Sequence, residues 1–350
     1  MTALNCEKRD ILNSECAVQR RDEWFGHLAN LFANRSDPYN EKNVFALHGF
    51  VSRPAEDELI YTDPEKWVLK CLELCTELPG FDGNRFAPVC VEYPAYGVHF
   101  IDKVLGADVF RIDSGCDVQW NASYLKSPVG CLKEPDLENS ETWLLAKRAA
   151  MAFIEADVSL PLFGMPTLSS PLNILLNLYG QEALFSMIDD PDAVTHDLRI
   201  ITDVIGFMHK WYREHIPYAQ LQPVISWDRT QPPGYGQVCG CTTQLISGKL
   251  YRQFIAPLDD ELLAIHPNGG MIHLCGSHLQ HLECFREMPH LKATQLNDRA
   301  ALDLPYYVEG LRDDQIIYVS PCPGLSADDI VRITKGERVV IVASIDAPRK

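Results

Sequence analysis

The sequence of 350 residues contains no uninterrupted apolar run of the about 18 residues that a membrane-spanning helix needs. Its first residues also lack the apolar core of a signal peptide. Basic residues are few, since 31 lysines and arginines stand against 48 aspartates and glutamates, and the net charge is −17. A nucleic-acid-binding surface needs clustered positive charge. We therefore expect a cytoplasmic protein with neither a nucleic-acid nor a membrane partner.

The sequence also has no internal repeat, no low-complexity tract and no glycine-rich phosphate fingerprint after its first predicted strand. The missing fingerprint argues against a dinucleotide-binding domain. Cysteine, by contrast, is plentiful, with 12 in the chain. In a large cytoplasmic protein most of these are expected to be reduced and buried. Cys71 and Cys75, four residues apart on an apolar helical face, are predicted to lie in the core.

From residue 88 onward, short apolar runs alternate with helical patterns, which is typical of parallel βα units. The predicted strands are residues 89–93, 108–112, 160–163, 223–227, 271–275, 293–297, 316–320 and 339–344. The predicted helices between and after them are residues 141–155, 191–215, 247–266, 277–287 and 326–334. Eight strands fit a closed (β/α)8 TIM barrel, and an open doubly wound α/β sheet is the alternative.

The segment before this alternation is more polar and is interrupted by proline and glycine. One clear amphipathic helix is predicted there, over residues 64–78, with Asp63 in front of it. The chain is therefore expected to consist of an N-terminal helical extension, residues 1–85, packed on a barrel formed by residues 86–350.

The residues with the clearest chemical potential are His273 and Cys275, at the end of a predicted strand. Residues i and i+2 of a strand face the same way, so both side chains would project together. Cys322 follows another predicted strand. In a barrel the carboxyl ends of strands converge on one rim, so Cys322 is predicted to complete a zinc site.

One neutral imidazole and two thiolates give Zn²⁺ a formally neutral site with one position open. A thiol entering that position would lose its proton to the metal's charge and could attack an activated methyl group. Cys239 and Cys241, separated by one glycine, are rival or additional ligands, or incidental thiols of a glycine-rich loop.

Acidic side chains are the candidate catalytic groups, because Asp228 and Asp298 each follow a predicted strand. Asp113 stands in a similar place, and all three could instead cap a turn or a helix. His278 and His281 are expected on a solvated helix face, with His278 alone near enough to the rim to act as a ligand.

Two segments resemble the uroporphyrinogen decarboxylase superfamily: residues 245–257, reading LISGKLYRQFIAP, and residues 270–276, reading GMIHLCG. The resemblance extends over about three quarters of the chain and implies a single (β/α)8 barrel with its site at the carboxyl ends of the strands. The decarboxylase branch carries an N-terminal arginine-rich motif, which residues 18–24 do not match. The other branch contains corrinoid-dependent methyltransferases with a zinc held by His-x-Cys and a distant Cys, and His273 and Cys275 match its first part.

The family's last cysteine follows the final strand, where this chain has Asp346 and no cysteine. The third ligand is therefore Cys322, Asp346 or a residue of the Cys239/Cys241 loop, or the zinc is absent. No Asp-x-His-x-x-Gly cobalamin motif occurs, so a corrinoid would be supplied by a partner protein.

The leading hypothesis is a zinc-dependent methyltransferase that moves a methyl group between a partner's corrinoid and a small thiol or other small molecule, possibly as a homodimer. The alternatives are a metal-free decarboxylase of a uroporphyrinogen-like substrate and a non-catalytic barrel that binds a tetrapyrrole or corrinoid.

Overall fold

The computed structural model describes most of the chain, namely residues 4–35, 58–77, 89–113, 118–223 and 229–342, with the backbone of 81–82 and 85–86. Asp228 and Asp346, two of the predicted site residues, lie outside the described residues. None of the helices in the described part is both long and apolar enough to cross a membrane.

Eight parallel strands form two sheets, and within each sheet every strand pairs with the next parallel strand along the chain. The first sheet contains β3 (Cys90–Glu92), β6 (Leu162–Gly164) and β7 (Leu221–Gln222). The second contains β8 (Gly236–Cys239), β9 (Gly270–Leu274), β10 (Leu291–Leu296), β11 (Ile316–Val319) and β12 (Val339–Ile341). Within the described ranges no pairing joins β7 to β8 or β12 to β3, so the fold is α/β with parallel sheets and a closed ring is not shown.

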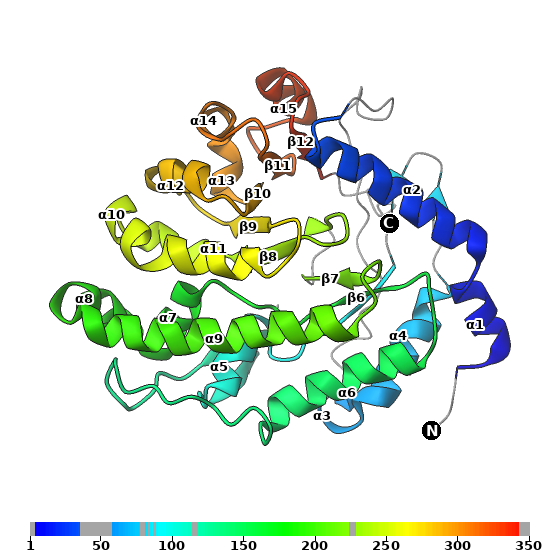
Figure 1. Ribbon diagram of the computed structural model, residues 1–350, viewed down its shortest axis with the longest axis horizontal. Coiled ribbons are helices and arrows are strands. Elements are labelled where there is room, and N and C mark those ends of the chain that lie inside the picture. The colour runs from blue at the N-terminus through cyan, green and yellow to red at the C-terminus, as the bar shows by residue number, and fades with distance from the viewer. Residues whose placement is uncertain are drawn as a thin grey trace.

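Helices follow one another around the outside of the strands (Figure 1). They include α5 (Phe100–Val104), α6 (Glu141–Glu155), α7 (Pro171–Tyr179), α8 (Gln181–Asp189), α9 (Pro191–His215), α10 (Gly248–Leu250), α11 (Ala256–Ala264), α12 (Leu282–Glu287), α13 (Arg299–Leu302), α14 (Leu304–Gly310) and α15 (Ala327–Thr334). The bounds predicted for α6 and α9 are confirmed. Both begin at strong caps: Ser140 accepts from the backbone N–H of Trp143, and Asp190 accepts from that of Ala193.

Two predicted helices are interrupted. The region 247–266 consists of α10, a π-helical turn (Tyr251–Ile255) and α11, which has a proline in its first turn. The region 277–287 begins with a 3₁₀ turn (Leu279–His281) before α12. Apolar spacing at a helical period does not distinguish these tighter or wider turns from a continuous α-helix.

The N-terminal part holds more helix than the sequence pattern suggested: α1 (Cys6–Leu12), α2 (Glu15–Phe32), α3 (Leu59–Thr62) and α4 (Pro64–Cys75). Cys71 and Cys75 of α4 are buried, as predicted. On α2, buried Trp24 and Leu28 belong to a cluster that includes inward-facing residues of both sheets. The large apolar residues of α2 lie three or four apart, as in an amphipathic helix, but the sequence analysis did not single out this spacing among the charged residues.

One prediction about the parallel strands was wrong, and one parallel strand was missed. Residues 108–112 do begin β4 (Val109–Asp113), but β4 pairs antiparallel with β5 (Val118–Ala122) and is not part of the parallel sheets. The parallel strand missed by the sequence analysis is β8, which lacks an apolar run. The first residue of β8 is Gly236, and only glycine fits there because a Cβ would collide with the ring of His266. The predicted strand 223–227 falls mostly outside the described residues, and β7 ends at Gln222, just before it.

A second two-stranded antiparallel pair, β1 (Phe81–Asp82) with β2 (Arg85–Phe86), lies between α4 and the first parallel strand. The division of the chain at residue 85 stays a prediction.

Candidate metal centre

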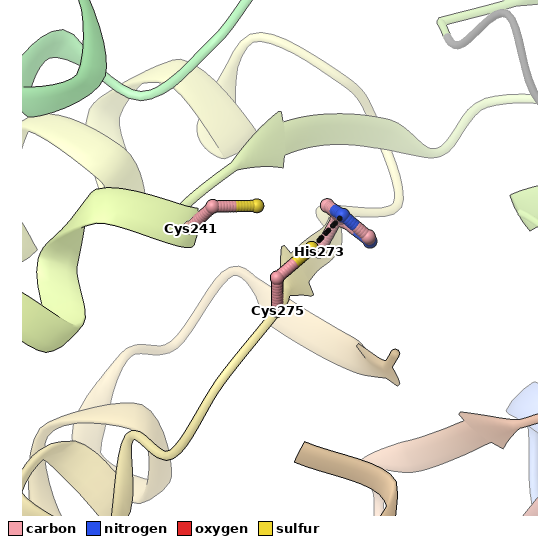
Figure 2. A group of neighbouring side chains, drawn as sticks. All are labelled: Cys241, His273 and Cys275. Atoms are coloured by element: carbon pink, nitrogen blue, oxygen red, sulfur yellow. Dashed lines mark hydrogen bonds between the residues drawn. The ribbon is translucent and has the colours of Figure 1, made fainter. Parts of the chain in front are cut away.

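Three soft side chains meet where β8 and β9 end. These strands run parallel, with Cys239 paired with His273, and the N–H of Gly240 donates to the carbonyl of His273 at 2.8 Å. Cys241 begins the 3₁₀ turn after β8, and Cys275 directly follows β9. Figure 2 shows the sulfur of Cys241 directed toward the His273–Cys275 pair. The local sequence therefore brings ligands from two neighbouring strands to one carboxyl edge.

The candidate ligand atoms of Cys241, His273 and Cys275 all lie within 4.8 Å of one another. Nε2 of His273 is 3.1 Å from Sγ of Cys275. His273 is buried and both cysteines are partly buried, so the fold shields much of the cluster from solvent. Among the described residues this is the one group of this kind, with three His, Cys, Asp or Glu ligands in mutual reach.

Glycine and histidine residues hold the two cysteine-bearing turns. Gly276, two residues after the end of β9, has a φ of +76°, and a Cβ there would collide with the side chain of Gln244. Nε2 of His278 lies 3.2 Å from the carbonyl oxygen of Gly240, and Nε2 of His281 lies 2.8 Å from that of Thr243. The turn bearing Cys241 is thus tied to the segment after Cys275.

This placement corrects the expectation for His278 and His281. Both rings are fully buried, not solvated, and burial lowers the pKa of each, that of His281 to about 4. The sequence assigned them to one regular helix, whereas the 3₁₀ turn Leu279–His281 directs both rings at backbone carbonyls. Neither belongs to the three-ligand group.

The orientation of the His273 ring is set by Gln295 on β10. Gln295 is the register partner of His273, is fully buried, and its Oε1 accepts from Nδ1 of His273. With the proton on Nδ1, the lone pair of Nε2 faces the sulfur atoms. A histidine ligand whose other ring nitrogen is held in this way is the usual arrangement around a bound metal.

The two partly buried thiols differ in acidity. The pKa of Cys275 is lowered, chiefly because the thiol of Cys241 donates to it and further because His273 lies beside it. The pKa of Cys241 is raised, because it is the donor in that pair and because it is partly buried. One sulfur of the pair is therefore poised to carry negative charge, as a metal ligand requires.

Arg229 and Cys239 flank the group. Nη2 of Arg229 donates to Nε2 of His273 at 3.3 Å, and Nη1 donates to Sγ of Cys239 at 3.4 Å. Nε2 of Gln237, two residues earlier on β8, lies 3.6 Å from the same sulfur. Burial raises the pKa of Cys239.

The structure brings His273 and Cys275 together but places Cys241, not Cys322, beside them. Cys322 lies three residues after β11, in a backbone bridge with Leu325. Its sulfur is not among the ligand atoms that lie within 4.8 Å of one another.

Asp298 is exposed and adjoins the cluster. Its φ of +47° is unusual for a residue other than glycine. Its carboxylate accepts from Nδ2 of Asn297 at 3.3 Å, and that amide nitrogen also lies 3.9 Å from Sγ of Cys275. The side chain of Asp113 lies outside the described residues, as does the whole of Asp228.

The sequence analysis missed Arg229 and Gln295. Gln295 could have been found from its register, because residues at equal distance along neighbouring strands lie side by side. Nothing in the local sequence singles out Arg229. Cys241 was considered as a rival ligand, and the Cys-Gly-Cys spacing was its signal.

No protein family model matches the chain, and no curated protein matches it. Solved structures do share its fold. A methyltransferase from Methanosarcina mazei aligns over 95% of this chain and 94% of its own, with a TM-score of 0.59 and 13% sequence identity. At 13% sequence identity this similarity shows a shared fold alone.

Proposed function

We propose that this chain is a zinc-dependent methyltransferase that moves a methyl group between a corrinoid, carried by a partner protein, and a small thiol or another small molecule. The observation that carries the proposal is the convergence of Cys241, His273 and Cys275 at the carboxyl edge of a parallel sheet. Ligand sites of α/β folds lie at this edge. Two further observations support the proposal. The chain shares its fold with a methyltransferase, and residues 270–276 resemble corrinoid-dependent methyltransferases.

The residues present fit a zinc ion. Cysteine sulfur and histidine nitrogen are the ligands zinc prefers, and a tetrahedral site with Zn–S of about 2.3 Å and Zn–N of about 2.0 Å separates neighbouring ligand atoms by roughly 3.5 Å. The separations here, 3.1 Å for one pair and no more than 4.8 Å for any, need little adjustment. One histidine and two cysteines also leave a fourth position free, as in catalytic zinc sites.

When bound, zinc would make a thiol in that fourth position acidic enough to react as a thiolate at neutral pH. The protein's own groups prepare for this. Gln295 keeps the proton of His273 on Nδ1, and the two cysteines release their protons to become anionic ligands. The partner's corrinoid would supply the methyl group and would retain the electron pair of the broken bond, while the acceptor thiol would gain the methyl group and give up its proton to a base beside the cluster.

Asp298 is our candidate for the group that takes this proton. Its carboxylate is exposed beside the cluster and is linked to Cys275 through Asn297. Asp228, which follows residues 223–227, is the second candidate catalytic carboxylate.

We further propose that the eight parallel strands close into a (β/α)8 barrel. In support, one buried cluster contains Cys90 and Leu162 of the first sheet together with Met271, Ala293 and Val340 of the second. Such a cluster is expected inside a barrel, where strands from all sides contribute to one core.

The activity is tested with zinc-loaded protein, free methylcobalamin and a panel of small thiols, by following the absorption change as the cobalt–carbon bond breaks. We expect turnover with at least one thiol, loss of turnover after chelation, and recovery when zinc is restored. His273→Ala should be inactive. The matched control is His290→Ala, which should stay active. His290 lies just before β10, at the opposite end of the sheet, and its ring pairs with Asp260. Release of CO₂ from uroporphyrinogen by metal-free protein would contradict the proposal.

A further inference from the structure

A fourth soft side chain, Cys239, lies next to the three proposed ligands. It is two residues before Cys241 and is the strand partner of His273. Its exposed fraction is 7%, yet its sulfur is not part of the group in which all ligand atoms lie within 4.8 Å. The distinction matters because a histidine with three cysteines makes a closed, structural zinc site, whereas a histidine with two leaves room for a substrate.

The contacts of the Cys239 sulfur explain why it stays apart. Arg229 donates to it from Nη1 at 3.4 Å, and Gln237 donates from Nε2 at 3.6 Å. Hydrogen bonds from a charged donor are stronger than neutral ones.

We propose that Arg229 and Gln237 are positioning residues that hold the sulfur of Cys239 as a hydrogen-bond acceptor and keep it from becoming a fourth ligand. This inference rests on the proposed metal centre. With Nε2 of His273 bound to a metal, the hydrogen bond from Nη2 of Arg229 to that nitrogen would be lost. The Nη1 contact involves no proposed ligand, so it remains to restrain Cys239 and the fourth position stays open.

Co²⁺ is the probe, because its sulfur-to-metal charge-transfer absorption grows with the number of Co–S bonds. We expect two such bonds in the wild-type protein. Removing both donors in the Arg229→Ala/Gln237→Ala variant should free Cys239 to bind. The absorption should then rise about 1.5-fold, the ratio of three sulfurs to two, and Co²⁺ should be held more tightly.

The matched control is the triple variant that adds Cys239→Ala, which should return the spectrum to the wild-type intensity. Cys239→Ala alone should leave the spectrum unchanged. If the double variant does not fold, Arg229→Gln removes the charge and retains a polar side chain, and its spectrum should move in the same direction.

A wild-type protein that binds Co²⁺ through three sulfurs, or a double variant that remains at two, would overturn the role of Arg229 and Gln237 and leave the metal centre intact. A wild-type protein that binds neither Co²⁺ nor Zn²⁺ would overturn the metal centre and this inference with it.

Discussion

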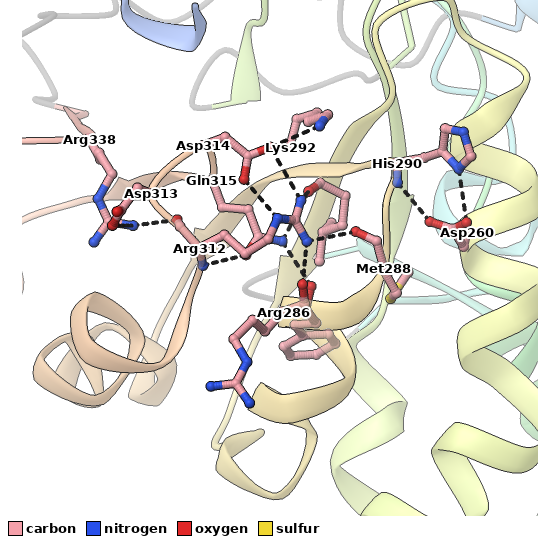
Figure 3. Close-up of polar contacts among 12 residues, drawn as sticks. Asp260, Arg286, Met288, His290, Lys292, Arg312, Asp313, Asp314, Gln315 and Arg338 are labelled. Atoms are coloured by element: carbon pink, nitrogen blue, oxygen red, sulfur yellow. Dashed lines mark hydrogen bonds and ion pairs between the residues drawn. The ribbon is translucent and has the colours of Figure 1, made fainter. Parts of the chain in front are cut away.

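The two ends of the parallel strands are built from opposite kinds of contact. Before β11, the guanidinium of Arg312 donates to the carbonyls of Arg286, Met288 and Leu291 and to the carboxylate of Asp314 (Figure 3). Gln315 adds bonds from its Nε2 to the carbonyls of Phe285 and Leu291. These bonds tie the loop after α12 to the starts of β10 and β11.

At the carboxyl ends of β8 and β9, the groups that meet are two thiols and an imidazole, which form fewer and weaker bonds with one another. Sulfur is a poor hydrogen-bond partner and a good metal ligand. The bonds of Arg312 and Gln315 therefore satisfy backbone carbonyls where β10 and β11 begin, whereas the two thiols and the imidazole at the ends of β8 and β9 retain atoms that can still bind a metal or a substrate.

The largest effect is expected on zinc affinity, at the carboxyl ends of β8 and β9. His273→Ala and Cys275→Ala should each weaken zinc binding by about a thousandfold, because one of three ligands is lost from a site in which each supplies several kcal/mol. Competition with a chromophoric chelator measures the affinity. Urea unfolding of the metal-free Cys275→Ala variant should change little, and a large loss of its metal-free stability would show that this side chain serves the core instead.

The corresponding change at the other end is Arg312→Ala. It leaves carbonyls of the α12–β10 loop without donors and should lower the free energy of unfolding by about 2–4 kcal/mol, while zinc content per folded molecule stays the same. Arg332→Ala, which removes an exposed arginine paired with Asp329, is the control and should cost no more than about 0.5 kcal/mol. Equal losses in the two variants would break the comparison.

Acid should act on a buried histidine pair near the starts of β8 and β9. Nδ1 of His209 and Nε2 of His266 are 2.9 Å apart, and burial lowers the pKa of both, that of His209 to about 3. Below about pH 6.5 the unfolded chain binds protons that the folded protein refuses, so stability falls as the pH falls toward 3. His209→Gln should reduce this slope by about 1.4 kcal/mol per pH unit.

The measurement is urea unfolding of metal-free protein between pH 6 and 4. Asp259, whose burial raises its pKa to about 7, contributes the opposite slope in both proteins, so the difference between wild type and variant is the quantity to compare. Identical slopes would show that the pair is not held neutral.

The smallest effect concerns the support of the metal ligand. Gln295→Ala removes the acceptor for Nδ1 of His273 and should weaken zinc binding by about 10- to 100-fold, less than loss of the ligand itself. Gln295→Glu keeps an acceptor and should bind zinc more tightly than the alanine variant does. An alanine variant with wild-type affinity would mean that the ring orientation is fixed by packing alone.

Much of the fold was predictable because it depends on local patterns. The helix 191–215 has an apolar stripe and begins with Asp190 and Pro191, and its bounds were found from these signals. The strand β8 was not predictable, because the segment Gly236–Cys239 has no apolar run and is held by its neighbours on either side. The hairpin of β4 was mistaken for a barrel strand, since exposed Phe110 and Ile112 resemble core residues in sequence.

The site was also predictable only where it depends on local sequence. His273 and Cys275 belong to one strand, so their common direction follows from spacing alone. Choosing among Cys241, Cys322 and Asp346 requires knowing which segment reaches the cluster, and that depends on tertiary packing. The contacts of His278 and His281 with the turn after β8 are an example of such packing. Each joins residues 38 apart in the sequence, and together they hold the turn that carries Cys241.

The most direct test is the zinc content of two matched variants, Cys241→Ala and Cys322→Ala, purified in parallel with the wild-type protein. The account predicts about one zinc per chain in the wild type and in Cys322→Ala, and almost none in Cys241→Ala. Zinc retained by Cys241→Ala and lost from Cys322→Ala would contradict it.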